Sequence, residues 1–452
     1  MKVNRETNQM DMLNGSLLDK ILLFALPLAA SSILQQLFNS ADVAVAGRFA
    51  GSNALAAVGG NAPVIGLFVN LFVGLSVGAN VLVANYIGQG KQENVNEAIH
   101  TIFAIAILSG LSLLVVGLIT AKYILVLIDV PKDVLPLASV YLRIYFIGMP
   151  FAMIYNFGAA VLRSIGDSKR PLLYLTLSGI LNVCLNLIFV IIFHLSVVGV
   201  ATATLVANAV NAALIWRHFR KEEGVFHLEP KKLSFHKEHV VQILKIGVPA
   251  GLQGIVFSLS NVCIQAAING FGNHAIAGSS AALNYEYFTF YVTSAFGQAA
   301  VTFTAQNYGA GQLKRCRKVL RYAMMLGVIG TGVMCVVFTL GKYFFVGIYT
   351  NEPLDIQFAV VRMIHVESLE FLPCFYEITG GALRGMGRSL LPAILTVFGS
   401  CVLRLIWLFT VFQRFPTFKM LLNVYPITWI ITSVLVIGAY FIVRKQVENQ
   451  KS

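Results

Sequence analysis

The sequence predicts an all-α, polytopic membrane protein that crosses the bilayer about twelve times. Of its 452 residues, 57% are hydrophobic and only 12% are charged, a balance that separates the chain from ordinary soluble proteins. Apolar runs of roughly 20 residues, the length that one transmembrane helix needs, recur along the whole chain between short polar breaks. Because these runs are unbroken rather than alternating in polarity, they favour helices over the strands of a membrane β-barrel.

The apolar runs fall into two groups on either side of one long polar stretch. The first group is expected at 21–46, 55–86, 98–121, 135–160, 170–194 and 197–216. The polar stretch RHFRKEEGVFHLEPKKLSFHKEH follows, and the second group is expected at 240–269, 275–306, 319–346, 355–381, 390–412 and 420–443. We therefore predict an N-terminal lobe (1–216), a cytoplasmic connector (217–239) and a C-terminal lobe (240–452).

The two groups repeat each other in sequence. LPLAASSILQQLFNSADV around Pro27 aligns with VPAGLQGIVFSLSNVCI around Pro249, ANYIGQGK aligns with QNYGAGQL, and LRSIGDSKRP aligns with LRGMGRSLLP. The offset stays near 222 residues. Each half has an even number of spans, so the copies should be related by a pseudo-two-fold axis along the membrane normal. Such lobes would face each other across a central cavity, where transporters that work by alternating access usually bind substrate.

The formal net charge of +13 reflects membrane topology rather than nucleic-acid binding. With the N-terminus inside, the inner segments carry most of the Lys and Arg residues, above all 217–245 and 444–451. The outer loops hold far fewer, namely Arg48, Lys122, Lys132, Lys342, Arg414 and Lys419. By the positive-inside rule, both termini are expected in the cytoplasm, with the chain spanning the plasma (inner) membrane many times.

Several protein classes are disfavoured because their motifs are missing. No removable signal peptide is predicted, and the six cysteines form neither a disulfide framework nor a metal spacing. HExxH, a convergent Ser/His/Asp set, cofactor motifs and phosphate-binding loops are also missing, so we expect no enzymatic activity, no metal and no cofactor. With no ATPase-sized soluble segment, uphill transport would depend on an ion gradient or on the membrane potential.

The first span carries a polar stripe on an otherwise apolar surface. Ser32, Gln35, Asn39 and Asp42 are spaced 3, 4 and 3 residues apart, so they share one helix face. A charged group in lipid costs roughly 3 kcal/mol even on insertion scales, so the stripe should face a protected cavity. The amides alone favour hydrogen-bonded helix packing, whereas the carboxylate of Asp42 indicates function.

Several motifs resemble one transporter family. NSADVAVAGRFAGSNALAAVG and GLSVGANVLVANYIGQGK look like the first two helices of the MATE (multidrug and toxic compound extrusion) family, and LRSIGD, LRGMGR and GVATATLVAN resemble it too. The similarity covers nearly the whole chain. It implies a twelve-helix antiporter that expels organic cations in exchange for protons or sodium ions. The wider superfamily also contains flippases for lipid-linked precursors, which share the two-lobe plan.

The resemblance assigns roles in the first lobe. Asp42 matches the first-helix aspartate that the DinF-like branch is thought to use as a cation-linked switch, and Asn182 matches a nearby family asparagine. On the fifth span, Ser178, Asn182 and Asn186 stand four residues apart on one face. Many relatives carry an aspartate where this chain has Asn186. The missing charge weighs against a sodium site, since hard cations favour several oxygen ligands, carboxylates among them.

We therefore expect cation coupling, by protons rather than sodium, through five residues of the first lobe: Asp42, Asn39, Asn182, Asn186 and Gln35. Interhelical hydrogen bonding is the alternative role for the asparagines. The seventh span carries a stripe of Ser258, Asn261 and Gln265 without an acid, where the NorM-like branch has a glutamate, so the DinF-like branch is favoured.

Acidic residues in the second lobe are candidates for substrate binding. On the tenth span, Glu367, Glu370, Cys374 and Glu377 follow the 3, 4, 3 spacing of one helix face. Neighbouring carboxylates repel each other and are costly in lipid, so at least one should be protonated, paired or hydrated. They could hold a cation or carry a proton, and structural ion pairs with Arg362 or Arg404 are the alternative.

Glu286 on the eighth span is surrounded in sequence by aromatic residues, among them Tyr287 and Tyr291. A carboxylate beside aromatic faces suits a lipophilic organic cation, although a membrane-interface aromatic belt is the other interpretation. The predicted substrate-binding residues are Glu286, Glu377, Tyr287, Tyr291, Asn261 and Glu370.

The sequence thus favours a secondary-active efflux antiporter for cationic amphipathic compounds, proton-coupled and monomeric, with no nucleic-acid partner. A flippase for a lipid-linked precursor is the alternative, and it would need a cationic cavity to hold phosphate groups. The efflux antiporter is preferred over the flippase because mid-span carboxylates outnumber mid-span arginines.

Overall fold

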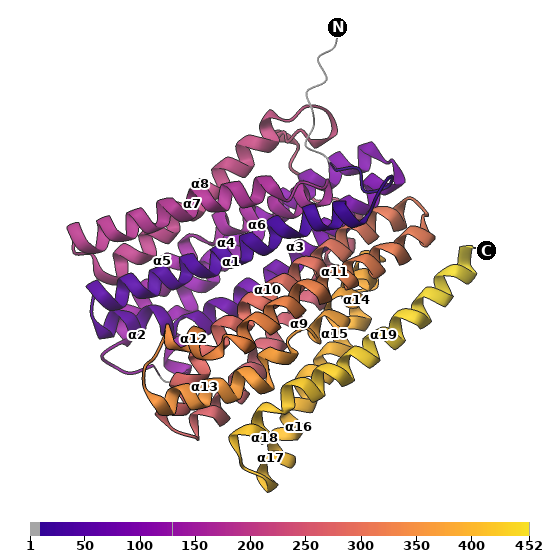
Figure 1. Ribbon diagram of the computed structural model, residues 1–452. Coiled ribbons are helices and arrows are strands. Elements are labelled where there is room, and N and C mark those ends of the chain that lie inside the picture. Colours follow the sequence, from indigo (N-terminus) through magenta and orange to yellow (C-terminus); the bar gives the residue numbers. More distant parts are fainter. Residues whose placement is uncertain (1–9, 129, 452) are drawn as a thin grey trace. The chain divides into compact units, whose positions relative to one another are not determined.

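The computed structural model describes residues 10–128 and 130–451, and every regular element within these ranges is a helix (Figure 1). By their contacts, the described residues divide into two compact units. Unit 1 contains Ala30–Val248 together with Met10, and unit 2 contains Asp11–Ala29 together with the chain from Pro249 onward. The helices α1 (Leu18–Phe49) and α9 (Lys237–Asn269) therefore contribute residues to both units.

Unit 1 holds the second part of α1 and the first part of α9. Between them come α2 (Ser52–Gly60), α3 (Ala62–Gln89), α4 (Gln92–Leu127), α5 (Leu135–Ile147), α6 (Met149–Ser164), α7 (Lys169–Leu187), the π-helix η1 (Ile188–Ile192), α8 (Ser196–Lys221) and the 3₁₀ turns η2 (Gly224–Phe226) and η3 (Pro230–Lys232). In Figure 1, α4, α6, α7 and α8 run side by side along a common direction, as their contacts also indicate.

Unit 2 holds the first part of α1 and the second part of α9. It continues with α10 (Asn273–Gly309), α11 (Leu313–Leu340), α12 (Lys342–Gly347), α13 (Pro353–His365), η4 (Glu367–Leu369), α14 (Pro373–Gly385), α15 (Leu390–Val397), the π-helix η5 (Phe398–Val402), α16 (Leu403–Phe409), α17 (Val411–Arg414), α18 (Phe418–Leu422) and α19 (Val424–Lys451). Within this unit, α10 packs against α11, α13 and α14.

Each predicted span coincides with one helix or with helices separated by a short break, so the predicted all-α fold, with its two six-helix lobes, is confirmed. Among the described residues, nine helices are long and apolar enough to cross a membrane, and the bent pair α5–α6 (47°) brings the number to ten. The predicted spans outside this set are α10 and the series α13–η4–α14. Both carry buried charged side chains, Glu286 on α10 and Arg362 on α13. The tenth span is divided into two helices that are each too short to cross a membrane alone, and α10 is rich in Ser, Thr, Asn, Gln and Tyr.

The tenth span is interrupted. α13 ends at His365 and α14 begins at Pro373, with the short η4 between them. After His365 the backbone continues in i→i+3 hydrogen bonds, such as that from Leu369 N to Val366 O, until Pro373 begins α14. A proline at the start of a helix needs no partner for a backbone N–H. The expectation that the polar residues of this span share one face of a continuous helix is therefore wrong, because the helical spacing applies only from Pro373 onward.

Glycines bring α14 close to α10. A Cβ atom on Gly381 would lie 2.5 Å from the carbonyl oxygen of Gly297, and one on Gly385 would lie 2.6 Å from that of Val301. In lipid, apolar burial gives little driving force between helices, so this close backbone approach is a main source of packing. It holds the acidic residues of the eighth and tenth spans on adjoining elements.

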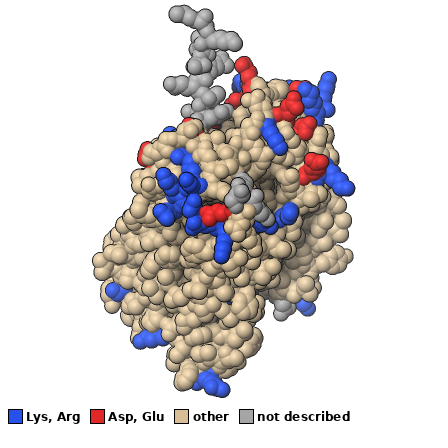
Figure 2. Space-filling view, turned by 90° about the vertical axis from the view of Figure 1, so that its right-hand side faces the viewer, with Lys and Arg blue, Asp and Glu red and all other residues tan. Residues whose placement is uncertain are grey.

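The surface has the composition of a membrane protein. Large apolar side chains are widely exposed on the spans, Leu127 at 85% and Leu340 at 78% among them, and a water-soluble monomer rarely exposes apolar surface on this scale. Figure 2 shows charged side chains gathered over part of one face, with broad uncharged surface around them. Lys2 and Arg5, which belong to the N-terminal segment expected in the cytoplasm, lie outside the described residues.

The connector packs against α4. Asn96 Nδ2 donates hydrogen bonds to the carbonyl oxygens of Val225 (2.9 Å) and His227 (3.3 Å), and the backbone N–H of Glu229 donates to His100 Nε2 (3.1 Å). By contacts, the connector and the first part of α9 belong to unit 1.

Candidate functional site

Asp42 on α1 accepts hydrogen bonds from two other helices of unit 1. Asn186 Nδ2 on α7 donates to Asp42 Oδ1, and Thr204 Oγ1 on α8 donates to Asp42 Oδ2 at 3.1 Å. Asn182 closes the network, since its Oδ1 accepts from Asn186 Nδ2 and its Nδ2 donates to Thr204 Oγ1, both at 3.3 Å. We call Asp42, Asn182, Asn186 and Thr204 the Asp42 cluster.

The Asp42 cluster is buried and contains a single ionisable group. Asp42 is 7% exposed and Asn186 is fully buried. Within the part of the chain that the structure describes, no Lys, Arg or His side chain forms an ion pair with Asp42. The Oδ1 atom of Asn186 has no hydrogen-bond partner among the described residues, so the cluster contains one buried acceptor that could accept a further hydrogen bond.

Of the residues predicted for cation coupling, the structure brings Asp42, Asn182 and Asn186 together. Gln35 and Asn39 are exposed on α1 and do not take part in the hydrogen bonds of the Asp42 cluster. Thr204 was not predicted from the sequence. It stands inside the motif GVATATLVAN, but nothing in the sequence distinguishes it from Thr202.

In unit 2, Glu286 on α10 is paired with Arg362 on α13. Arg362 Nε donates to Glu286 Oε1 at 2.6 Å and Arg362 Nη2 donates to Oε2 at 2.8 Å, a bidentate geometry. The two side chains are only 7% and 2% exposed. The charge of Glu286 is therefore already matched within the protein.

Two further glutamates lie near this pair. Thr289 Oγ1 donates to Glu367 Oε1 at 2.7 Å, and both Glu367 and Glu370 are buried. The Oε2 atoms of both glutamates have no hydrogen-bond partner among the described residues. Glu370 lies within electrostatic range of Glu286 and Glu367, as well as of Arg404 and Arg362.

Arg404 on α16 is the second arginine near these glutamates. It donates from Nη1 to Asn261 Oδ1 at 2.9 Å, and its guanidinium lies 4.7 Å from the ring centroid of Tyr425. We call Glu286, Arg362, Glu367, Glu370 and Arg404 the ionic cluster. Among these five residues the structure has one ion pair, Glu286–Arg362, so neither Glu367 nor Glu370 forms an ion pair of its own.

Glu377 on α14 lies outside the ionic cluster and is less buried. Arg384 Nη1 approaches Glu377 Oε2 at 3.4 Å, while Arg384 Nη2 donates to Gln253 Oε1 at 2.9 Å. The Glu377 side chain is 21% exposed, so its ion pair is loose and open to solvent or ligand.

Two predicted aromatic residues form an accessible surface on α10. The rings of Tyr287 and Tyr291 are stacked, with centroids 6.3 Å apart and an interplanar angle of 17°. Tyr287 is 39% exposed. A flat, partly exposed pair of rings can accept a lipophilic or cationic ligand face.

Comparison with known proteins shows to which family the chain is related. The sequence profile of the MatE family matches twice, at residues 27–188 and 249–410, and the two matches begin 222 residues apart. "Probable multidrug resistance protein YoeA" of Bacillus subtilis is 26% identical over 83% of both chains. "Multidrug export protein MepA" of Staphylococcus aureus is 25% identical over 74% of both. A solved structure, the outward-facing conformation of a multidrug resistance MATE family transporter of the MOP superfamily, aligns over 98% of this chain and 99% of its own with a TM-score of 0.92 at 20% identity.

The double match covers more than half of the chain and confirms both the internal repeat and the predicted resemblance. The family consists of membrane transporters rather than enzymes. The chain belongs to the MATE family.

Proposed function

We propose that this transporter exports cationic amphipathic compounds by alternating access, in exchange for protons that bind at Asp42. The observation that carries the proposal is the Asp42 cluster, in which a single buried carboxylate accepts hydrogen bonds from an amide and a hydroxyl and forms no ion pair among the described residues. A buried charge that lacks a cationic partner is costly in a fixed structure and is typical of a transport pathway.

Each neighbour of Asp42 can serve both protonation states. An amide carries a donor and an acceptor, and a hydroxyl can turn from donating to accepting. Asn186 Nδ2 donates to the ionised carboxylate, and a flip of the same amide would present Oδ1 to the protonated acid. Thr204 Oγ1 can change roles in the same way. Protonation therefore requires no large rearrangement of the cluster.

Sodium coupling has less support. Alkali and other hard cations favour several oxygen ligands, with carboxylates among them. The Asp42 cluster offers one carboxylate, and Asn186 replaces a second acid with an amide whose nitrogen, rather than its oxygen, faces Asp42.

For the substrate, unit 2 offers a solvent-accessible carboxylate at Glu377 and the stacked rings of Tyr287 and Tyr291. An ion pair together with aromatic contact suits lipophilic cations. The relatives are named as multidrug resistance and multidrug export proteins, which supports the transport of several different compounds. We further propose that the protein is a monomer in the plasma (inner) membrane with both termini in the cytoplasm, because basic residues concentrate in the inner segments.

The test is transport by purified protein in liposomes, with pH and sodium gradients imposed separately and uptake of a fluorescent monovalent cation as readout. A pH gradient alone should drive exchange in sodium-free buffer. Asp42→Asn should reduce coupled exchange to the level of empty liposomes while folding and membrane insertion stay intact. Glu93→Gln, which removes an exposed carboxylate on α4, is the matched control and should transport normally. Drug movement that requires sodium and ignores the pH gradient would refute proton coupling.

A flippase for lipid-linked precursors is the second candidate, favoured by the buried guanidinium groups of Arg362 and Arg404. Arginine binds phosphate well, but Arg362 is already engaged by Glu286, and Arg404 by Asn261 and Tyr425. Liposome-based scrambling of a pyrophosphate-linked lipid, with no export of cations, would select this candidate instead.

A further inference from the structure

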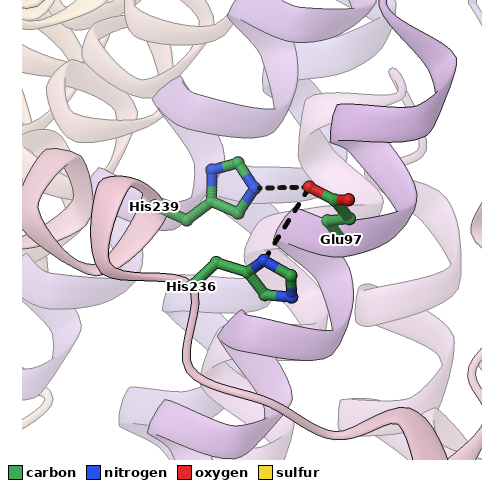
Figure 3. A group of neighbouring side chains, drawn as sticks. All are labelled: Glu97, His236 and His239. Carbon is green, nitrogen blue, oxygen red and sulfur yellow. Dashed lines mark ion pairs between the residues drawn. The ribbon is translucent and has the colours of Figure 1, made fainter.

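Three metal-binding side chains meet in unit 1 beside the connector (Figure 3). Glu97 projects from α4, His239 lies in the first turn of α9 and His236 immediately precedes that helix. Glu97 Oε2 lies 3.5 Å from His239 Nε2 and 3.9 Å from His236 Nδ1, and all three potential ligand atoms lie within 4.8 Å of one another. Tetrahedral zinc with bonds of about 2.1 Å places its ligand atoms about 3.4 Å apart, so only a small contraction is needed.

The second nitrogen of each imidazole already faces a suitable partner. His236 Nε2 lies 2.8 Å from Ser234 Oγ, and His239 Nδ1 lies 3.2 Å from the hydroxyl of Tyr86 on α3. Histidines that bind metals almost always donate their other ring N–H to such a partner, which fixes the tautomer and the ring orientation. The arrangement leaves His236 Nδ1 and His239 Nε2 pointing at Glu97, as Figure 3 shows.

The burial of the three residues is graded. The side chain of His239 is 3% exposed, whereas those of His236 and Glu97 are 39% and 50% exposed. An ion could therefore enter from solvent and keep a water ligand. His100, one turn after Glu97 on α4, is not available as a ligand because its Nδ1 contacts the carbonyl oxygen of Asn96 and its Nε2 accepts from Glu229.

We infer that Glu97, His236 and His239 form a binding site for a divalent transition metal ion, with Zn²⁺ as the representative ion. Two imidazoles and one carboxylate are the ligands that such ions prefer, whereas Mg²⁺ and Ca²⁺ prefer all-oxygen sites. A bound ion would tie the start of α9, and with it the end of the connector, to α4. This inference does not depend on the transported substrate or on the coupling ion.

Zinc titration of the purified full-length protein, prepared without a polyhistidine tag, tests the site by calorimetry. The parent should bind one equivalent tightly, and Zn²⁺ should raise its thermal unfolding midpoint, because an ion that binds only the folded state stabilises it. Glu97→Gln, His236→Asn and His239→Asn should each lower the affinity at least tenfold. Tyr86→Phe, which removes only the partner of His239, should lower it about tenfold. His274→Asn removes an exposed histidine of a His–Asp pair elsewhere in the chain and is the matched control.

X-ray absorption of the parent protein with one equivalent of Zn²⁺ gives an answer even if a variant fails to fold. We expect two imidazole ligands with Zn–N distances of about 2.0–2.1 Å and no sulfur at about 2.3 Å. Sulfur coordination would assign the ion to the exposed thiols of Cys184 or Cys263 and would overturn the inference. Parent-like affinity in all three ligand variants would overturn it as well, as would a parent that binds no zinc.

Discussion

The two halves of this transporter match the same family profile, yet their buried charges are arranged in opposite ways. The Asp42 cluster holds one acid among neutral hydrogen-bond partners, while the ionic cluster sets three acids against two arginines. An unpaired buried acid can change its protonation state at low structural cost. A bidentate buried ion pair resists such a change, because removal of either charge strands the other. The two halves thus share their helix pattern but differ in how their buried charges are paired.

The largest expected effect comes from breaking the ion pair of unit 2. Arg362→Met leaves the carboxylate of Glu286 buried without its partner, which should cost about 3–5 kcal/mol of stability. The double variant Glu286→Gln/Arg362→Met removes both charges and should recover most of that loss. Thermal unfolding in detergent measures both, and Asp42→Asn should change stability by less than about 1 kcal/mol. Equal destabilisation by the single and double variants would mean that the pair matters through packing rather than charge.

The next effect concerns the looser acid of unit 2. Glu377→Gln should weaken binding of a fluorescent monovalent cation by about ten- to a hundredfold, the equivalent of losing 1–3 kcal/mol, and leave a neutral analogue unaffected. Glu286→Gln should also weaken cation binding, but together with a loss of stability, because Arg362 loses its partner. Equal effects of Glu377→Gln on both ligands would make this residue structural. Tighter binding of an anionic lipid head group would favour the flippase.

A third substitution makes the first half more acidic. Asn186→Asp places a second carboxylate against Asp42, where the amide nitrogen now donates. Two adjacent carboxylates repel each other unless a cation or a proton lies between them. We expect sodium to stimulate exchange by this variant about tenfold, roughly 1.4 kcal/mol, in the liposome assay. Exchange that stays indifferent to sodium would show that the site lacks further oxygen ligands, and not only a second charge.

The sequence predicted the transmembrane plan well, because a helix in lipid must be apolar over about 20 residues and this constraint is local. The sequence was less informative where polar groups interrupt an apolar run. Hydropathy predicts the tenth span as one helix, but the α-helix is interrupted between His365 and Pro373, so the α-helical spacing does not apply to Glu367 and Glu370. Helical periodicity cannot reveal a break whose backbone is accommodated inside the protein.

The partners of the charged residues depended on tertiary contacts that one sequence does not specify. Arg362 was a candidate partner for the glutamates of its own span, and instead it pairs with Glu286 on α10. Arg404, the other candidate, bonds Asn261. For Asp42 and Asn182 the family resemblance supplied the proximity, and composition alone would not have done so.

The smallest expected effect tests the residue that sequence reasoning missed. Thr204→Val keeps the shape of the side chain and removes one hydrogen-bond donor to Asp42, while Asn186 still donates to the other carboxylate oxygen. A single hydrogen bond of this kind contributes about 0.5–1.5 kcal/mol, so proton-driven exchange should fall about two- to tenfold. Thr202→Val on the same helix α8 is the matched control and should leave exchange unchanged. If both variants transport like the parent, the hydroxyl of Thr204 only fills space, and the two asparagines alone would have to satisfy Asp42 in both protonation states.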